Sequence, residues 1–147
     1  MKILCLGEVL IDMLSAGAAD QSEMPAMNSF QPYAGGAPAN VAVAVAKLGG
    51  QGAMVSKVGD DTFGRFLQDD LATVACDDTS VLHFCSGSIS GPELLPGTDY
   101  ILNKAKQENM LVCLDINYRP AFWDDTANAP GRIDEVAKKV SILKASR

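Results

Sequence analysis

The 147-residue sequence lacks the patterns that mark several large classes of protein. It has one histidine and one tryptophan, and its four cysteines form no Cys-x-x-Cys pair. Neither Gly-x-x-x-x-Gly-Lys-Ser/Thr nor Gly-x-Gly-x-x-Gly occurs, which removes two common phosphate-binding loops. No internal repeat is present, and no apolar run is long enough to span a bilayer. These absences argue against a P-loop nucleotidase, a dinucleotide-binding protein, a membrane protein and a repeat array.

The charge balance disfavours large anionic partners. Twelve Lys and Arg residues stand against eighteen Asp and Glu residues, so the formal net charge is −6, and no basic run reverses this locally. A negative field repels nucleic acid and anionic membranes. Hydrophobic residues make up 48% of the chain, which is typical of one packed globular domain. We therefore expect a small-molecule ligand and no nucleic-acid or membrane partner.

The four cysteines are Cys5, Cys76, Cys85 and Cys113, and three of them fall in apolar, strand-like runs. This placement is typical of buried, reduced thiols and predicts a cytoplasmic protein, with metal ligation as a minor alternative. His83 lies in such a run beside Phe84, which favours a hydrogen-bonded core histidine over a catalytic base. We predict no metal ligands.

Apolar runs alternate with helical patterns along the whole chain, which predicts an α/β fold with about five parallel strands and helices on both faces. We expect strands over 3–12, 53–56, 81–86, 111–114 and 140–144, and helices over 39–48, 62–74, 96–109 and 131–139. A short edge strand is expected near residues 30–33, because Pro32 is tolerated only at an edge. Residues 15–28 are expected to form a loop.

Two adjacent glycines, Gly35 and Gly36, precede the first expected helix. Neither carries a Cβ, so the backbone can turn sharply and approach a ligand. Pro38 suits the first turn of a helix, and Asn40 would lie in that turn beside free backbone N–H groups. Such a helix start can hold a polar, hydroxylated or anionic ligand. The alternative is an ordinary turn before a helix.

Two further polar groups are expected where strands end. Asp12 would lie at the carboxyl end of a central strand, where open α/β sheets bind ligands, although a turn or capping aspartate is the alternative. Asn117 and Arg119 follow strand 111–114 in an Asp-x-Asn-x-Arg-Pro run. The residue before Pro120 favours an extended backbone, and an arginine there can bind a phosphate or carboxylate through two hydrogen bonds. A surface ion pair of Arg119 with Asp115 or Asp124 is the alternative.

These segments together resemble the ribokinase-like (PfkB) carbohydrate kinases, and among them the bacterial fructokinases. The resemblance rests on Gly-Glu-Val-Leu-Ile-Asp at 7–12, Gly-Gly-Ala-Pro-Ala-Asn at 35–40, Val-Gly-Asp-Asp-Thr-Phe-Gly at 58–64 and Asp-x-Asn-x-Arg-Pro at 115–120. It implies a three-layer αβα fold and transfer of a phosphoryl group from ATP, with Mg²⁺, to a sugar hydroxyl. It implies substrate-binding roles for Asp12, Gly35, Gly36, Asn40, Asn117 and Arg119. It also implies a turn near the cleft at Gly59, Asp60 and Gly64, for which a purely structural role is the alternative.

The resemblance also predicts missing parts. Relatives insert lid strands after the segment that matches Asp77 to Ser80, whereas this sequence passes straight to the strand at 81–86, so we expect an internal deletion after Ser80. In relatives a late Gly-Ala-Gly-Asp loop supplies the catalytic base and the anion hole, and Gly17 to Asp20 only faintly resembles it. We therefore interpret 1–147 as a partial PfkB domain, a substrate-binding half without catalytic residues. Residues 28–34 would be a remnant of the lid.

Two sets of alternatives stay open. The chain could be a non-catalytic sugar-binding or interaction protein, with an exposed sheet edge covered by a second copy. The sugar could be ribose, a nucleoside or 2-keto-3-deoxygluconate instead of fructose. The 147-residue chain alone is not expected to turn over ATP.

Overall fold

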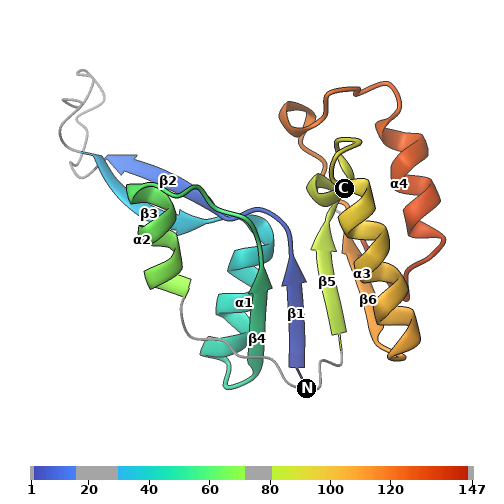
Figure 1. Ribbon diagram of the computed structural model, residues 1–147, viewed down its shortest axis with the longest axis horizontal. Coiled ribbons are helices and arrows are strands. Elements are labelled where there is room, and N and C mark those ends of the chain that lie inside the picture. The colour runs from blue at the N-terminus through green and yellow to red at the C-terminus, as the bar shows by residue number, and fades with distance from the viewer. Residues whose placement is uncertain (1, 16–29, 72–80, 146–147) are drawn as a thin grey trace.

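A five-stranded parallel sheet forms the centre of the protein, and a two-stranded antiparallel ribbon projects from it (Figure 1). The computed structural model describes residues 2–15, 30–71 and 81–145. The sheet has the order β4-β1-β5-β6-β7, and the ribbon pairs β2 with β3. The strands are β1 (Lys2–Leu6), β2 (Leu10–Ser15), β3 (Phe30–Gly35), β4 (Gln51–Val55), β5 (Val81–Cys85), β6 (Leu111–Asp115) and β7 (Ile142–Lys144). The predicted α/β fold class is confirmed.

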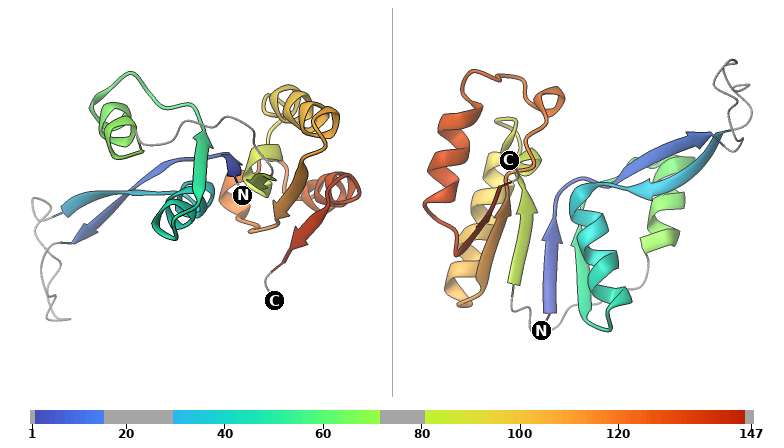
Figure 2. Two further views of the ribbon diagram at one scale, coloured as in Figure 1. Left: turned by 90° about the horizontal axis from the view of Figure 1, so that it is seen from below. Right: turned by 180° about the vertical axis from the view of Figure 1, so that it is seen from behind.

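Four α-helices and two short 3₁₀ helices connect the described strands. They are α1 (Ala37–Lys47), α2 (Thr62–Leu71), η2 (Ser86–Ile89), α3 (Leu95–Gln107), η3 (Pro120–Phe122) and α4 (Ala129–Ala137). Figure 2 shows α1 on the opposite side of the sheet from α2 and α3. We call the side of α1 the back face and the side of α3 the front face. Helices on both faces were predicted, and this arrangement confirms it. None of the described helices is long and apolar enough to cross a membrane.

The main core lies on the front face of the sheet. Leu82 pairs in register with Val112, and Phe84 pairs with Leu114, so these four side chains point to the same face. Ala105 of α3 and Val136 of α4 join them in one buried cluster. The back face is covered by α1, whose Ala42 carbonyl oxygen lies 2.5 Å from the position that a Cβ on Gly52 would take. The close approach of α1 to β4 therefore requires glycine at residue 52.

Helix α1 begins and ends as its sequence predicts. Pro38 lies in its first turn, where its missing N–H breaks no hydrogen bond. At the other end Gly49 has φ +78°, and its N–H donates to the Ala46 carbonyl. The Gly50 N–H donates to the Val45 carbonyl, which completes a Schellman motif.

The predicted strand over 3–12 is wrong, because the chain breaks after Leu6. Gly7 has φ +145°, a conformation that side-chain-bearing residues rarely adopt, and a Cβ there would lie 2.7 Å from the Pro38 ring. The backbone turns out of the sheet at this point and re-forms as β2. Asp12 consequently lies on the ribbon and not at the carboxyl end of a central strand.

Several predictions fall outside the described residues. These are the loop at 15–28 beyond its first residue, the Gly17 to Asp20 segment, the last part of the helix at 62–74, Cys76 and the junction after Ser80. The remaining predicted helices and strands, at 30–33, 39–48, 53–56, 81–86, 96–109, 111–114, 131–139 and 140–144, are each present within a few residues of their predicted bounds.

Candidate functional site

Asp12 and Gly35 meet on one face of the ribbon. Asp12 pairs with Tyr33, and Leu10 pairs with Gly35, so alternation puts the side chains of Asp12 and Tyr33 on the face toward which a Cβ on Gly35 would point. The space that this Cβ would need is taken by Oδ2 of Asp12. Glycine at residue 35 therefore lets an exposed carboxylate lie directly against bare backbone.

Gly36 carries the chain from the ribbon into α1. It is the N-cap of the helix, with φ +103°, and no side chain caps the helix start. A Cβ on Gly36 would lie 2.6 Å from the Glu8 carbonyl oxygen, so both backbone conformation and space demand glycine. The predicted turn into a helix start is confirmed, although Gly35 belongs to β3 and only Gly36 separates this strand from α1. The segments 7–9 and 35–36 pack together where the ribbon leaves the sheet.

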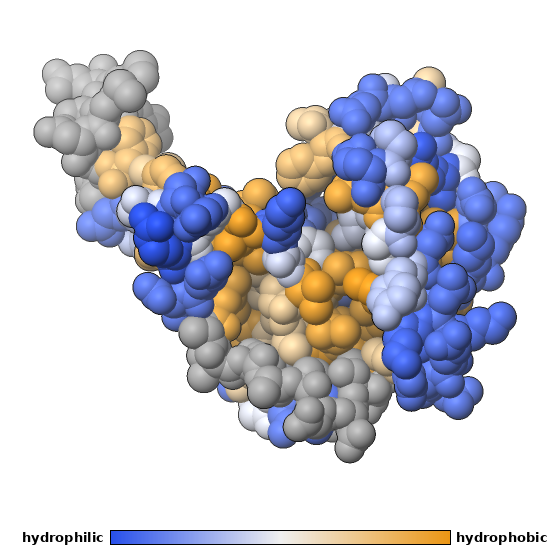
Figure 3. Space-filling view, viewed as in Figure 1, coloured by the Kyte–Doolittle hydropathy of each residue, from blue (hydrophilic) through white to orange (hydrophobic). Residues whose placement is uncertain are grey.

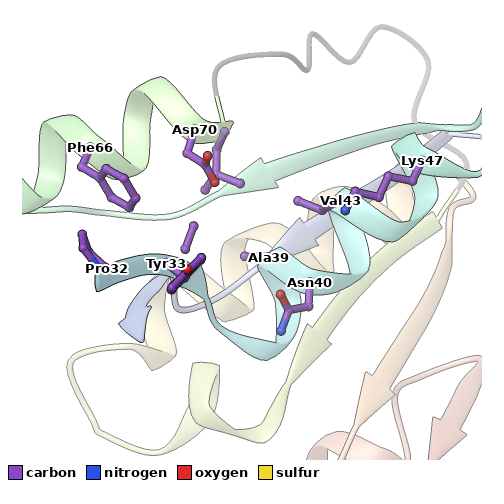
Figure 4. Close-up of a pocket in the computed structure, with 10 residues that line it drawn as sticks. Pro32, Tyr33, Ala39, Asn40, Val43, Lys47, Phe66 and Asp70 are labelled. Carbon is purple, nitrogen blue, oxygen red and sulfur yellow. The ribbon is translucent and has the colours of Figure 1, made fainter. Parts of the chain in front are cut away.

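Asn40 lies near this junction, on the exposed side of α1. Its N–H donates to the Gly36 carbonyl oxygen at 2.9 Å as the first helical hydrogen bond. Its side chain lines a hollow of about 430 Å³ together with Tyr33 and, from α2, Asp70 (Figure 4). Lys47 lies two helical turns further along the same face of α1 and lines the same hollow.

Asp12 does not line the hollow that contains Asn40. Tyr33 connects the two residues, because it pairs with Asp12 across the ribbon and borders the hollow beside Asn40. The structure thus brings Asp12 together with Gly35, and Asn40 together with Tyr33.

Asn117 and Arg119 lie beyond the carboxyl end of β6. Asn117 has φ +24°, and apart from the helix-ending Asn109 it is the one non-glycine residue in the described part of the chain with positive φ. Arg119 has φ −127° and ψ 105°, so the predicted extended backbone before Pro120 is confirmed. Strained backbone at a strand end is a feature of functional loops.

The predicted alternative for Arg119, an ion pair with Asp115 or Asp124, is wrong within the described residues. Asp115 instead accepts a hydrogen bond from Lys144 Nζ at 2.6 Å, and this bond raises the pKa of Lys144. No described ion pair includes Arg119, whose side chain is exposed. The guanidinium is therefore available to an anionic ligand.

Contacts at Gly87 link the Arg119 loop to the start of the ribbon. A Cβ on Gly87 would lie 3.4 Å from Glu8 Oε2 and 3.7 Å from the Phe122 ring. Because β1, β5 and β6 are parallel, their carboxyl ends share one edge of the sheet, and Glu8, Gly87 and Phe122 lie there. Among the described residues, no hydrogen bond or ion pair joins Arg119 to Asp12 or Asn40.

Two buried titratable groups lie on the back face near this edge. Burial raises the pKa of the Cys85 thiol to about 12, helped by Glu8 and Asp115. Burial lowers the pKa of His83, and its Nε2 has no hydrogen-bond partner in the part of the chain that the structure describes. The predicted burial of His83 is confirmed, but the predicted full set of hydrogen bonds is not found. Cys5 and Cys85 are buried and Cys113 is partly buried.

The turn at 59–64 has a structural role in this structure. The Gly64 N–H donates to Asp61 Oδ1 at 2.7 Å, so Asp61 caps α2 and Thr62 opens it. The space that a Cβ on Gly64 would need is filled by the Gly59 carbonyl. Among the described residues, Asp60 forms an exposed ion pair with Arg65 at 3.7 Å.

Sequence reasoning missed Tyr33, Lys47 and Asp70 as residues of the hollow. Tyr33 could have been found as the residue that faces Asp12 on the neighbouring strand. Lys47 could have been found because it lies seven residues, or two helical turns, after Asn40 on the same helix face. Asp70 is contributed by α2, whose position no local pattern reveals. No group of three His, Cys, Asp or Glu residues in the described ranges is placed to hold a metal ion, so we assign no Mg²⁺ ligand.

Comparisons with known proteins found similar sequences and a similar fold. The family model of pfkB family carbohydrate kinases matches residues 1–83. A probable fructokinase of Arabidopsis thaliana, fructokinase-7, is 46% identical over 80 residues, which are 54% of this chain and 22% of the relative. An ATP-dependent 6-phosphofructokinase of Thermoanaerobacterium thermosaccharolyticum is 26% identical over 190 positions, covering 98% of this chain and 58% of the relative.

A solved structure has the same fold. The fructokinase of Xylella fastidiosa with bound ATP superposes with a TM-score of 0.80 at 28% identity, covering 97% of this chain and 60% of that protein. The chain therefore spans less than two thirds of the length of each of these three proteins.

Proposed function

This chain belongs to the pfkB family of carbohydrate kinases, and we propose that its ribbon and α1 form the sugar-binding part of an ATP-dependent, fructokinase-like enzyme. The proposal rests most on one observation, the contact between the Asp12 carboxylate and the bare backbone of Gly35. A sugar kinase must orient one hydroxyl group among several, and this contact offers a fixed acceptor for that purpose.

The chemistry of a sugar suits this arrangement. One carboxylate can accept hydrogen bonds from two neighbouring hydroxyl groups, and such charge-assisted bonds are stronger than neutral ones. Gly35 and Gly36 carry no side chain, so a sugar ring could approach the backbone beside Asp12. Asn40 would then donate or accept through its amide from the first turns of α1.

Arg119 and Asn117 would act on the anionic side of the ligand. Arg119 is exposed, extended and without a described ion pair, which suits bidentate binding of a phosphate. Asn117, held at positive φ, would orient the loop that carries it. We propose that these residues contact the phosphate that is transferred or the phosphorylated product.

ATP, with Mg²⁺, would be the phosphoryl donor. The transfer needs a base for the sugar hydroxyl and backbone donors or cations for the charge on the γ-phosphoryl group. We assign none of these groups within the present 147 residues. We propose that this chain binds and orients the sugar.

Thermal unfolding with different ligands tests the sugar assignment. We expect millimolar fructose to raise the unfolding temperature more than ribose, a nucleoside or 2-keto-3-deoxygluconate at equal concentration, because a ligand stabilises the state that it binds. Asp12→Asn should abolish the shift, whereas Asp69→Asn, a change of an exposed carboxylate on α2, should leave it intact. A larger shift with one of the other three ligands would replace fructose, and no shift with any of them would refute a sugar site.

A non-catalytic role is the second candidate, and the ribbon favours it. Three of its large apolar side chains, Met13, Leu14 and Tyr33, are about half exposed at 49%, 55% and 48%, and both ribbon strands have a free edge among the described residues. Such a surface suits a second copy of this chain. ADP formation from ATP and fructose by the purified 147-residue chain, lost in Asp12→Ala, would exclude the non-catalytic role. A concentration-dependent dimer without turnover would support it.

A further inference from the structure

No helix in the described part of the chain covers the front face of β1 and β4. A hollow of about 470 Å³ opens there between α2 and α3, and Figure 3 shows its apolar floor between two hydrophilic flanks. Leu6 of β1, Val55 of β4, and Leu94 and Ile101 at and within α3 form its apolar lining. Val55 and Leu94 are 40% and 41% exposed, so apolar surface stays accessible in this hollow.

The topology explains why this face should carry a helix. β4 and β5 are parallel but not adjacent, because β1 lies between them. A right-handed crossover from β4 to β5 would place its helix on the front face, over β1. The described helix of this crossover is α2, but α2 contacts β2 of the ribbon, and none of its residues lines the hollow. Among the described residues, no helix therefore occupies the position over β1 that such a connection normally fills.

The comparison with the Thermoanaerobacterium 6-phosphofructokinase gives a second, independent argument. The alignment extends over 190 positions, whereas this chain has 147 residues, so at least 190 − 147 = 43 positions of the relative have no counterpart here. They lie inside the alignment, because it covers 98% of this chain. Forty-three residues are ample for one or more helices. The relative thus has polypeptide without a counterpart in this chain, and the described residues of this chain leave an apolar face of the sheet open.

The rim of the hollow specifies the charge of an occupant. Two carboxylates, Glu8 and Glu93, and one cation, Lys57, are among the residues that line it, and neither glutamate forms an ion pair among the described residues. We propose that this hollow is a docking site for an amphipathic helix from another polypeptide. An apolar stripe would cover Leu6 and Val55, and a basic residue would face Glu8 and Glu93. This inference does not depend on the sugar site.

A labelled peptide tests the docking site. The probe is a synthetic peptide that contains the longest segment of the Thermoanaerobacterium 6-phosphofructokinase without counterpart in this chain, with a fluorophore at one end. Fluorescence anisotropy should show saturable binding, with a Kd below about 100 μM, and a scrambled peptide should not bind. Val55→Asp should weaken binding at least tenfold. Leu143→Asp, at an apolar residue that is 50% exposed on β7, should not.

Leu94→Lys serves as a second blocking variant, in case Val55→Asp fails to fold by circular dichroism. Its charge should repel a basic occupant and weaken binding by a similar factor. The proposal is overturned if the peptide does not bind or if both blocking variants bind it as well as wild type. It is also overturned if Leu14→Asp on the ribbon abolishes binding while Leu94→Lys does not. A dimer of this chain that dissociates in Leu94→Lys would assign the face to a second copy and overturn it as well.

Discussion

Replacing Gly35 by alanine perturbs the proposed sugar site at a single atom. Gly35 does not have positive φ, so its backbone accepts alanine without strain. The new Cβ would meet Oδ2 and Cγ of Asp12, the latter at 2.8 Å. The Asp12 carboxylate must therefore rotate away from the backbone of Gly35, while the ribbon pairing can stay as it is.

The size of the effect follows from the hydrogen bonds at stake. A hydrogen bond to a charged group contributes roughly 1.5–3 kcal/mol, so the loss of one such bond between Asp12 and a sugar hydroxyl should weaken binding about 10- to 150-fold. The cost in folding stability should be smaller, below about 1 kcal/mol. Overpacking costs more than that in a closed core, but Asp12 is exposed and free to move.

A double-mutant cycle read out by isothermal titration calorimetry with fructose isolates this contact. We expect Gly35→Ala to weaken fructose binding in the wild-type chain but to add little to Asp12→Ala, so that the two changes couple by at least about 1 kcal/mol. Urea unfolding of the four proteins without sugar provides the matching stability values. If Gly35→Ala weakens binding equally in the presence and absence of the Asp12 carboxylate, the steric explanation is refuted.

Four further predictions follow from other contacts. Gly36→Ala should lower the free energy of unfolding in urea by at least about 2 kcal/mol, because the residue has φ +103° and a backbone carbonyl occupies the space of the new Cβ. Gly97→Ala in α3 has open space around it and should raise the free energy of unfolding by roughly 0.5–1 kcal/mol. His83 is buried and its pKa is lowered, so as the pH falls the histidine is protonated in the unfolded state before it is protonated in the folded state. The free energy of unfolding should therefore fall as the pH drops below 6.5, by at most about 1.4 kcal/mol per pH unit for this one group. His83→Leu should flatten that part of the stability profile. Cys85, with a pKa near 12, should resist iodoacetamide at pH 8 in the folded protein, and peptide mapping that finds it alkylated as fast as in urea would contradict its burial. Arg119→Lys should weaken binding of fructose 6-phosphate about tenfold or more while affecting fructose little, and equal losses for both ligands in calorimetry would argue against a phosphate contact.

The central sheet was predictable because its strands are short apolar runs. Val81–Cys85 and Leu111–Asp115 are bounded by turn-forming or polar residues, and each pairs along its whole length with a neighbour in the sheet. The start of α1 was also predictable, because Gly36 tolerates positive φ and Pro38 fits the first turn of a helix whatever surrounds them. Local chemistry decides these elements, so the sequence alone was sufficient.

Asp12 shows where local reasoning fails. The run from Ile3 to Asp12 is apolar enough to read as one strand, and only the conformation of Gly7 divides it. The space that a Cβ on Gly7 would need is taken by Pro38 and Ser88, which are distant in sequence. A glycine in a strand pattern signals a possible break, but its neighbours in space decide whether the chain turns.

The hollow around Asn40 could not be predicted for a related reason. Its walls come from α1, the ribbon and α2, and the position of α2 depends on tertiary packing. The same holds for Asp115, whose partner is Lys144 and not Arg119. β6 and β7 are hydrogen-bonded neighbours, and this pairing sets the two side chains beside each other. Pairings between strands depend on sheet order, which the sequence constrains only through crossover rules.

Nuclear magnetic resonance tests the proposed sugar site most directly. A titration of ¹⁵N-labelled protein with fructose should shift the amide signals of Asp12, Gly35 and Gly36 together and saturably, with smaller changes at Asn40. Signals of the front-face hollow, such as Val55, should stay in place. Saturable shifts that leave Gly35 and Gly36 unmoved, or no shifts at any concentration, would contradict the account.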